Sequence, residues 1–211
     1  MPPKRFLVNP RDPEGIILEE AAQVILEGEI VAIPTETFYA LAADGLNAEA
    51  VSRVLEAKER ETSKPTGLLV ADEEMVASVA KRVPRTAVKL MNRFWPGPLN
   101  LVFDAVASLS PGILGDRMGV SVRVPASLPA LGLIRILDRP ITATSANRTG
   151  EDPPRTADQV IESLGDFLEI VIDGGETRGG LPSTMVDVRG KRPILLRAGA
   201  IPWEEIMACY A

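Results

Sequence analysis

Residues 15–34 of this 211-residue chain read GIILEEAAQVILEGEIVAIP, and this stretch decides the fold class. Over residues 15–27, apolar side chains recur at the spacing of one helical face: Ile17, Ala21, Val24 and Ile25. Gly28 ends the predicted helix, and the apolar, β-branched run at 30–34 predicts a buried strand. A helix followed directly by a buried strand is typical of an α/β fold.

The same alternation continues along the chain on both sides of this stretch. Further helices are predicted at 47–60, 72–83, 85–94, 127–137, 156–164 and from Pro202 onward. Three of them follow good N-cap residues: Asn47, Asp72 and Thr156. Further strands are predicted at 5–9, 67–71, 99–104, 119–124, 140–144, 169–172, 184–188 and 193–197. The closely spaced last strands indicate a mixed sheet, and we predict a single α/β domain over residues 1–211.

Composition excludes several classes of chemistry. The chain has no histidine, which removes serine–histidine–aspartate triads, cysteine–histidine pairs and histidine-ligated metals. Any catalysis then depends on carboxylates, lysine, arginine, hydroxyls, backbone groups or a metal carried by the substrate. The formal net charge of −6 argues against a globally basic nucleic-acid binder, but it is compatible with a local basic cleft.

Cysteine use and hydropathy predict the cellular setting. The single cysteine, Cys209, cannot form an intrachain disulfide. No signal sequence is recognisable, and no apolar run approaches the roughly 20 residues that a transmembrane helix needs. We therefore expect a cytoplasmic protein with no membrane partner.

Cations crowd the end of the predicted helix 47–60. The apolar stripe of this helix consists of Val51, Val54 and Leu55. Lys58 continues the stripe one turn later, and Arg60 and Lys64 follow. Three cations before a strand can hold a phosphate or a carboxylate. A solvated charge cluster, partly neutralised by the neighbouring glutamates, explains them equally well.

Two arginines lie on predicted strands whose side chains alternate. In GVSVRV at 119–124 the valines share one face, while Arg123 shares the other with Ser121. Arg197 repeats this arrangement in ILLRAG at 194–199. If the apolar face of each strand is buried, the arginine points into a groove or into solvent.

Hydroxyl side chains gather at the ends of predicted strands. They are found in Thr35-Glu36-Thr37, from Thr142 to Asn147, and in Ser183-Thr184. Open α/β sheets bind ligands at strand ends, where hydroxyls and an amide can contact ligand oxygens. For any one cluster, turn and capping chemistry is the stronger explanation. The chain contains neither a G-x-x-x-x-G-K-[ST] loop nor a G-x-G-x-x-G fingerprint, so an ATP site would be of neither standard type.

Seven segments, in order, resemble the YrdC-like family of threonylcarbamoyl-AMP synthases over about residues 15–200. They are PTETFYALAADG at 34–45, Lys58-x-Arg60 with Lys64-Pro65, FWPGPLNLVF at 94–103, VSVRVP at 120–125, ITATSANRTG at 141–150, PSTMVDV at 182–188 and LLRAGAI at 195–201. Each segment is a weak signal alone. Their common order is specific, above all the K-x-R and S-x-N motifs together.

This resemblance implies a twisted, open, mixed sheet with helices packed around it and a concave, locally positive ligand cavity. It also implies an L-threonylcarbamoyladenylate synthase, a nucleotidyltransferase acting on threonine, bicarbonate or CO₂, and ATP with Mg²⁺. Mg²⁺ would be held by phosphates and water rather than by protein side chains. The adenylate would pass to a threonylcarbamoyl-transferase complex that modifies tRNA next to the anticodon; whether the cavity also contacts tRNA or double-stranded RNA stays open.

The resemblance assigns a role to each motif residue. Threonine would be bound by Thr35, Arg123 and Ser183, with Arg123 facing its carboxylate. ATP would be bound by Lys58, Arg60, Lys64, Ser145, Asn147 and Arg197. Lys58 and Arg60 would lie near the phosphates and act in catalysis, and Lys64 could serve either the phosphates or bicarbonate.

The chain departs from the family pattern in two places. After S-A-N the family usually continues with a loop ending in Ser-Pro-Thr, whereas here Pro153 lies near the expected serine. One ATP contact is then lost or is taken over by a neighbour such as Thr156. The chain also stops soon after LLRAGAI, as expected for the short, single-domain type of the family.

Three other interpretations fit the sequence less well. A YciO-like RNA-binding relative shares the fold but lacks K-x-R and S-x-N in this form. Carbamoyl-transfer modules of hydrogenase-maturation proteins belong to much longer chains with zinc-finger segments. A plain RNA-binding domain fits poorly with 4% aromatic residues, because single-strand binders stack bases on aromatic rings.

Overall fold

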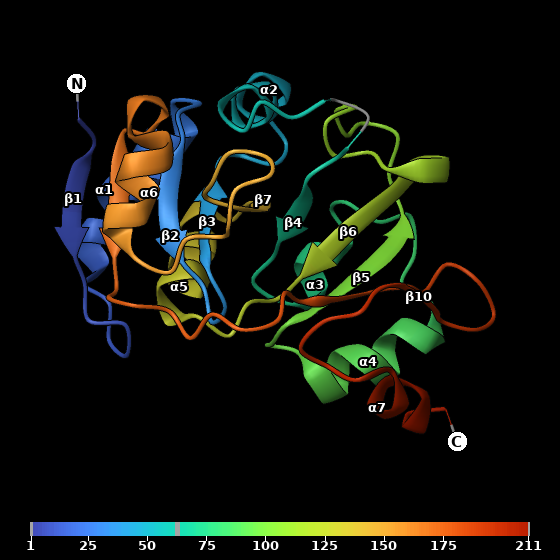
Figure 1. Cartoon of the computed structure of the whole chain (residues 1–211). Coiled ribbons are helices and arrows are strands. Elements are labelled where there is room, and N and C mark those ends of the chain that lie inside the picture. The colour runs from blue at the N-terminus through green and yellow to red at the C-terminus, as the bar shows by residue number, and fades with distance from the viewer. Residues whose placement is uncertain (1, 62–63, 211) are drawn as a thin grey trace.

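The structure, a computed structural model, describes residues 2–61 and 64–210. Its strands form one mixed ten-stranded sheet in the order β1-β8-β2-β3-β7-β4-β6-β5-β9-β10 (Figure 1). They are β1 (Lys4–Leu7), β2 (Val31–Pro34), β3 (Tyr39–Ala42), β4 (Gly67–Leu69), β5 (Leu99–Asp104), β6 (Gly119–Arg123), β7 (Ile141–Ser145), β8 (Ile170–Asp173), β9 (Thr184–Asp187) and β10 (Ile194–Arg197). The first strand pairs in parallel with the eighth, so residues about 165 positions apart in the sequence are neighbours in the sheet.

The helices confirm most of the predicted elements and their caps. They are α1 (Gly15–Leu26), α2 (Ala48–Ala57), α3 (Glu73–Val76), α4 (Arg85–Phe94), α5 (Leu128–Leu137), α6 (Ala157–Leu164) and α7 (Trp203–Ala208). Asn47, Asp72 and Thr156 each accept a backbone N–H of the helix that follows. Thr156 and Gln159 complete a reciprocal capping box.

One predicted helix is shorter in the structure, and one strand was not predicted. The helix predicted at 72–83 is only α3, because residues 79–81 hydrogen bond to the end of β5 instead: Lys81 donates to the Asp104 carbonyl and Val106 donates to the Val79 carbonyl. Strand β3 was not predicted. All four of its residues are buried, but its sequence, YALA, lacks the β-branched residues that marked the equally buried β2 as a strand.

The sheet is covered differently along its length. Around β8, β2 and β3, helices α1 and α5 pack on one face and α2 and α6 on the other. Around β5, β6 and β9, one face packs against α3, α4 and α7. The valines of β6 belong to that core, while Ser121 and Arg123 line a cavity on the opposite face, as their alternation predicted.

Tyr39, at the start of β3, forms hydrogen bonds with the end of β8 and the loop that follows it. Its side chain is fully buried, and its hydroxyl lies 2.8 Å from the Gly175 carbonyl and 3.2 Å from Asp173 Oδ1. Burial raises the pKa of this hydroxyl, so it stays a donor at all ordinary pH values. The contact joins strands far apart in the sequence.

We expect Tyr39→Phe to lower the free energy of unfolding by about 1–2 kcal/mol, because it removes a hydroxyl that joins this buried side chain to Asp173 and to the Gly175 carbonyl. Urea unfolding would measure the change. Tyr210→Phe is the matched control: its hydroxyl also donates to a carbonyl, that of Thr86, but the residue is only partly buried. An equal loss in both variants would contradict the importance of the buried contact.

Candidate ligand site

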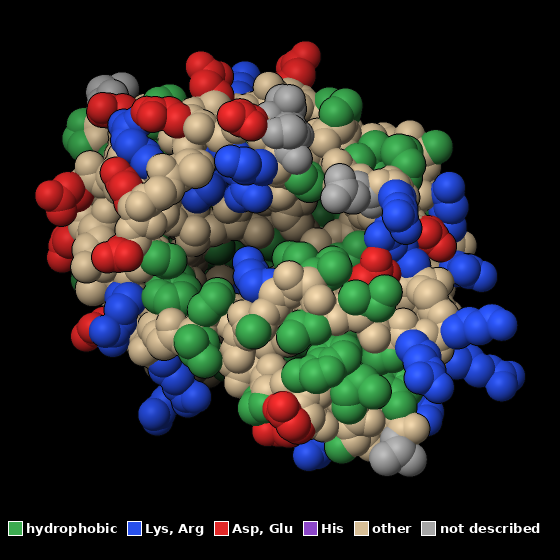
Figure 2. Space-filling model, turned by 45° about the vertical axis from the view of Figure 1, so that its right-hand side comes forward, with side chains coloured by type: hydrophobic (Ala, Val, Ile, Leu, Met, Phe, Trp, Pro, Cys, Tyr) green, Lys and Arg blue, Asp and Glu red, His purple; other side chains and the backbone are tan. Residues whose placement is uncertain are grey.

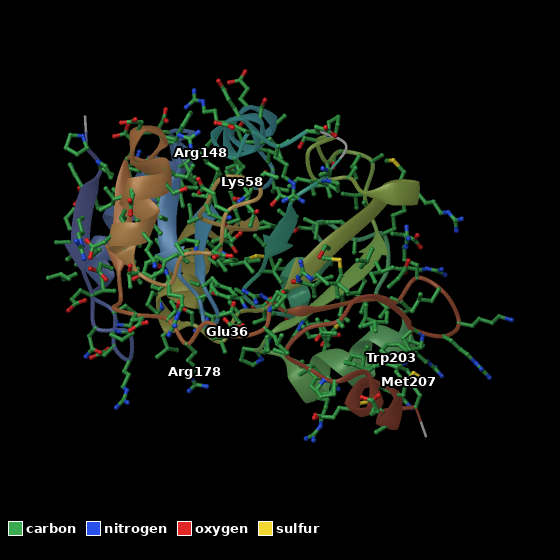
Figure 3. All side chains as sticks on the ribbon, viewed as in Figure 1. Glu36, Lys58, Arg148, Arg178, Trp203 and Met207 are labelled. Atoms are coloured by element: carbon green, nitrogen blue, oxygen red, sulfur yellow. The ribbon has the colours of Figure 1, made fainter. Side chains whose placement is uncertain are left out.

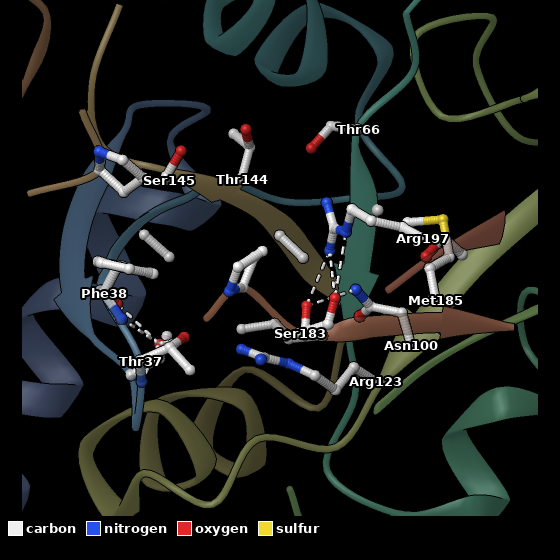
Figure 4. A pocket seen from close by; sticks show the side chains of 18 of the residues that line it. Thr37, Phe38, Thr66, Asn100, Arg123, Thr144, Ser145, Ser183, Met185 and Arg197 are labelled. Carbon is white, nitrogen blue, oxygen red and sulfur yellow. Dashed lines mark hydrogen bonds between the residues drawn. The ribbon is translucent and has the colours of Figure 1, made fainter. Parts of the chain in front are cut away.

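A cavity of about 280 Å³ opens between the two halves of the sheet, and Figure 2 shows the hollow from outside. Its walls come from the ends of β3 and β7, from β4, β5 and β6, and from the loop before β9 (Figure 4). The polar residues that line it are Thr35, Thr37, Arg60, Thr66, Asn100, Ser121, Arg123, Thr144, Ser145, Ser183 and Arg197. No carboxylate is among the described lining residues, so the cavity is suited to an anion.

Arg123 is the most deeply buried of the cavity cations, at 6% exposed. Its Nη1 lies 3.2 Å from Glu36 Oε1, and Glu36 Oε2 accepts the Ala126 N–H. The Nε of Arg123 is buried and has no hydrogen-bond partner among the described residues. Burial lowers the pKa of Arg123 and the Glu36 carboxylate opposes that shift, so the guanidinium stays charged. It therefore retains an unused donor beside the cavity.

Arg197, predicted to bind ATP, is held by Ser183, which was predicted to bind threonine. Its Nη2 donates to the Ser183 carbonyl at 2.8 Å and to Ser183 Oγ at 3.0 Å, as Figure 4 shows. Asn100 donates to the same hydroxyl from β5, at 2.8 Å. Desolvation of its guanidinium and the charges of Arg123 and Arg60 lower the pKa of Arg197. The three arginines are thus close enough to repel one another, and an anion between them would relieve that repulsion.

Arg60 is aimed into the cavity by backbone groups. Its Nε donates to the Lys64 carbonyl at 2.6 Å and its Nη2 to the Pro65 carbonyl at 3.0 Å. Its Nη1 lies 3.5 Å from Thr144 Oγ1 on β7. Since two of the contacts are with neutral carbonyls, the positive charge of Arg60 is not cancelled by them.

Lys58 is buried at the C-terminal end of α2, at 3% exposed (Figure 3). Its Nζ donates to the carbonyls of Ser145, at 2.5 Å, and Asn147, at 2.6 Å. These bonds tie α2 to the loop that follows β7, and they leave one ammonium proton for a further partner. Burial, with the nearby charge of Arg60, lowers the pKa of Lys58 to about 8.

Thr35 organises the turn between β2 and β3. Its hydroxyl donates to the Phe38 carbonyl at 2.7 Å and accepts the backbone N–H groups of Thr37 and Phe38 at 3.3 Å. This local bonding is the turn chemistry that serine and threonine commonly provide. The same turn also fixes the position of Glu36.

Six of the nine residues predicted for the site line the cavity together: Thr35, Arg60, Arg123, Ser145, Ser183 and Arg197. The other three are not among its described lining residues. Lys58 lies behind Ser145, as described above, and Lys64 is exposed and contributes its carbonyl to Arg60. Asn147 instead lines a second hollow together with Glu151 and Pro153.

The loop after β7 carries Pro153 near the position where the family pattern has a serine. Pro153 lines both hollows, and Asn147 Oδ1 is buried without a hydrogen-bond partner among the described residues. Thr156, expected as a replacement contact, caps α6 and is not among the described residues that line either hollow.

Two polar residues, one lining the cavity and one paired with Arg123, were not predicted from the sequence. Asn100 belongs to the alternating strand β5 and could have been found from the same period-2 pattern that marked Arg123. The sequence marks Glu36 only as a member of the Thr35-Glu36-Thr37 cluster. Its partner Arg123 lies 87 positions away, and nothing local in the sequence marks that pairing.

The described residues contain no group of three or more cysteine, aspartate or glutamate side chains placed to hold a metal ion. Within residues 2–61 and 64–210, no helix combines the length and apolarity needed to cross a bilayer.

Comparison with known proteins agrees with this geometry. The Sua5/YciO/YrdC family model, described as "Telomere recombination", matches residues 23–199. The threonylcarbamoyl-AMP synthase of Pyrococcus abyssi is 45% identical over 186 residues, which are 88% of this chain and 55% of that protein. The chain thus spans little more than half the length of that curated relative.

Solved structures confirm the predicted fold. The crystal structure of P. abyssi Sua5 complexed with L-threonine superposes with a TM-score of 0.92 at 42% identity, covering 97% of this chain and 60% of that one. Escherichia coli YciO superposes with a TM-score of 0.85 at 21% identity over 95% of this chain and 97% of that one. The second likeness is one of fold alone.

Proposed function

Because the chain belongs to the Sua5/YciO/YrdC family, we propose that it is a threonylcarbamoyl-AMP synthase. In this proposal it joins L-threonine, bicarbonate or CO₂, and ATP into L-threonylcarbamoyladenylate and releases pyrophosphate. The enzyme class is that of a nucleotidyltransferase, since AMP is transferred to a carbamate oxygen. The product serves a downstream transferase that modifies tRNA.

The observation that carries the proposal is the convergence of Arg60, Arg123 and Arg197 on one hydroxyl-lined cavity. The reaction brings together two anions, the threonine carboxylate and the ATP triphosphate. Arg123 has a free, buried donor for the carboxylate, and Ser183 lies beside it. Arg60 and Arg197 then face the phosphates, with Ser145 and the remaining proton of Lys58 nearby.

The reaction requires little general acid–base catalysis by the protein. The free amine of threonine adds to CO₂ and loses a proton, which gives a carbamate. A carbamate oxygen then attacks the α-phosphorus, and the bond to pyrophosphate breaks. Fixed cations stabilise the charge that spreads over the phosphoryl oxygens, and Mg²⁺ carried by ATP supplies the same stabilisation. Catalysis comes mainly from holding the reactants together, so a site without histidine suffices.

The direct test is pyrophosphate release from purified protein with ATP, Mg²⁺, threonine and bicarbonate. We expect release that requires both threonine and bicarbonate. Folded protein that releases no pyrophosphate in response to threonine would overturn the synthase proposal.

ATP affinity is expected to fall as the pH rises above 8. The pKa of Lys58 is about 8 in the absence of ligand, and a bound phosphate favours the charged form. ATP therefore binds the protonated protein more tightly, and its Kd should rise by up to about fivefold between pH 8 and pH 9. Calorimetry in buffers of different ionisation enthalpy would show the accompanying proton uptake.

The control for this prediction is Lys58→Arg, because arginine stays charged across the range and should flatten the pH dependence. A constant ATP affinity from pH 7 to pH 9 in the wild type would show that Lys58 does not face the nucleotide.

A further inference from the structure

Asn100 lies on the cavity wall and helps to hold the hydroxyl of Ser183. Its Nδ2 donates to Ser183 Oγ at 2.8 Å, and Arg197 Nη2 donates to the same oxygen at 3.0 Å (Figure 4). Asn100 belongs to β5 and Arg197 to β10, while Ser183 directly precedes β9, the strand between them. Two neighbouring strands therefore fix the hydroxyl oxygen from both sides.

The hydrogen-bonding capacity of a hydroxyl decides what Ser183 can offer to a ligand. A serine hydroxyl accepts through two lone pairs and donates one proton. The amide nitrogen of Asn100 and the guanidinium of Arg197 only donate, so together they occupy both lone pairs. Within residues 2–61 and 64–210, no group accepts the Ser183 proton. Ser183 thus has a donor, and no acceptor, left for a ligand.

This donor belongs to the same cavity wall as Arg123. Leu101 and Val122 are antiparallel partners, so Asn100 and Arg123, the next residues along their strands, oppose one another across β5 and β6. Asn100, Ser183 and Arg123 all line the cavity, and its described lining residues include no carboxylate. A hydroxyl donor and a guanidinium on one wall are suited to the two oxygens of a carboxylate.

We propose that Asn100 is a positioning residue: by donating to Ser183 Oγ, it directs the Ser183 proton to the carboxylate of the amino-acid substrate. This inference rests on the proposed function, which takes threonine as the substrate and Arg123 as the partner of its carboxylate. Asn100 acts through Ser183 and takes no part in making or breaking bonds. A side chain that accepted from Ser183 instead would withdraw that proton from the substrate.

The test compares two substitutions of Asn100 by steady-state pyrophosphate release at varied threonine and varied ATP. Asn100→Asp keeps the shape but only accepts, so it captures the Ser183 proton; we expect kcat/KM for threonine to fall at least about 100-fold. Asn100→Leu removes one hydrogen bond and offers no acceptor, so the fall should be only about three- to tenfold. The KM for ATP should change by less than about threefold in both variants.

The same substitutions in a Ser183→Ala background separate the role of the hydroxyl from that of charge. There Asn100→Leu should add less than about twofold, because no hydroxyl is left to direct. Asn100→Asp should add about tenfold or less, which is the repulsion between its charge and the substrate carboxylate. Asn92→Asp makes the same change on exposed α4, away from the described cavity lining, and should leave activity unchanged. Melting curves establish that each variant is folded.

Three results would overturn the inference. An Asn100→Asp variant as active as the wild type, or one no worse than Asn100→Leu, would show that the donor at this position does not matter. Penalties that persist in full in the Ser183→Ala background would show that Asn100 acts independently of Ser183. In each case the wild type keeps threonine-dependent pyrophosphate release, so the proposed function would stand. A wild type without that activity would overturn both.

Discussion

Replacement of Arg123 by alanine is expected to reduce kcat/KM for threonine by about 10²- to 10³-fold. The guanidinium is the buried cation with an unused donor at the cavity, and removing one partner of a buried charged contact costs about 2–5 kcal/mol. Steady-state pyrophosphate release at varied threonine would measure the loss. The effect should fall on threonine, with the KM for ATP changing much less.

Arg123→Ala also leaves Glu36 buried without its counter-ion, so the variant must be tested for folding. Arg123→Lys keeps a charge but not the planar fork and should recover part of the activity. Arg139→Ala is the surface control: this arginine pairs with Asp44, is not among the described residues that line the cavity, and should retain full activity. If Arg123→Ala stayed within threefold of the wild type, the threonine carboxylate would have to be bound elsewhere.

Lys58→Met is expected to lower kcat/KM for ATP by about 10²-fold with little change in stability. The substitution removes a cation beside the proposed phosphate site and the two bonds that hold the carbonyls of Ser145 and Asn147. Loss of these bonds costs about 1–3 kcal/mol each. Removing the buried ammonium offsets this loss. Its pKa is lowered from 10.5 to about 8 by folding, so the charged group destabilises the folded state by about 3 kcal/mol at neutral pH.

Activity and thermal unfolding, measured side by side, would test this second prediction. Lys81→Met removes an exposed lysine away from the cavity and should change neither quantity. A large fall in stability, parallel to the fall in activity, would mean that Lys58 acts only by holding the loop after β7.

The sequence predicted a residue's position correctly where the periodicity of a single strand or helix determined it. Period-2 alternation placed Arg123 opposite the valines of β6, because one face of that strand packs against helices and the other faces the cavity. Continuation of an apolar helical stripe likewise marked Lys58 as a cation on the buried side. Both are local consequences of secondary structure.

Contacts across long sequence separations could not be predicted in this way. The partners of Lys58 are two backbone carbonyls 87 and 89 positions away. Every residue has a backbone carbonyl, so the residue type cannot indicate which carbonyls Lys58 binds. Asn147 was expected beside Ser145, but β7 ends at Ser145, so the strand no longer fixes where Asn147 points. Strand β3 was missed because its sequence, YALA, has two alanines and no β-branched residue, whereas the equally buried β2 contains valine and isoleucine.

The pairing of β1 and β2 with β8 has a consequence for how the chain is made. Translation adds about 5–20 residues per second, so the roughly 140 residues between β2 and the end of β8 take on the order of 10–30 s to emerge. During that interval β1 and β2 have left the ribosome, but β8, the strand that lies between them and pairs with both, has not. We expect this half of the sheet to form last on the ribosome, and nascent chains cut before residue 170 to remain open to proteases at their N-terminal end.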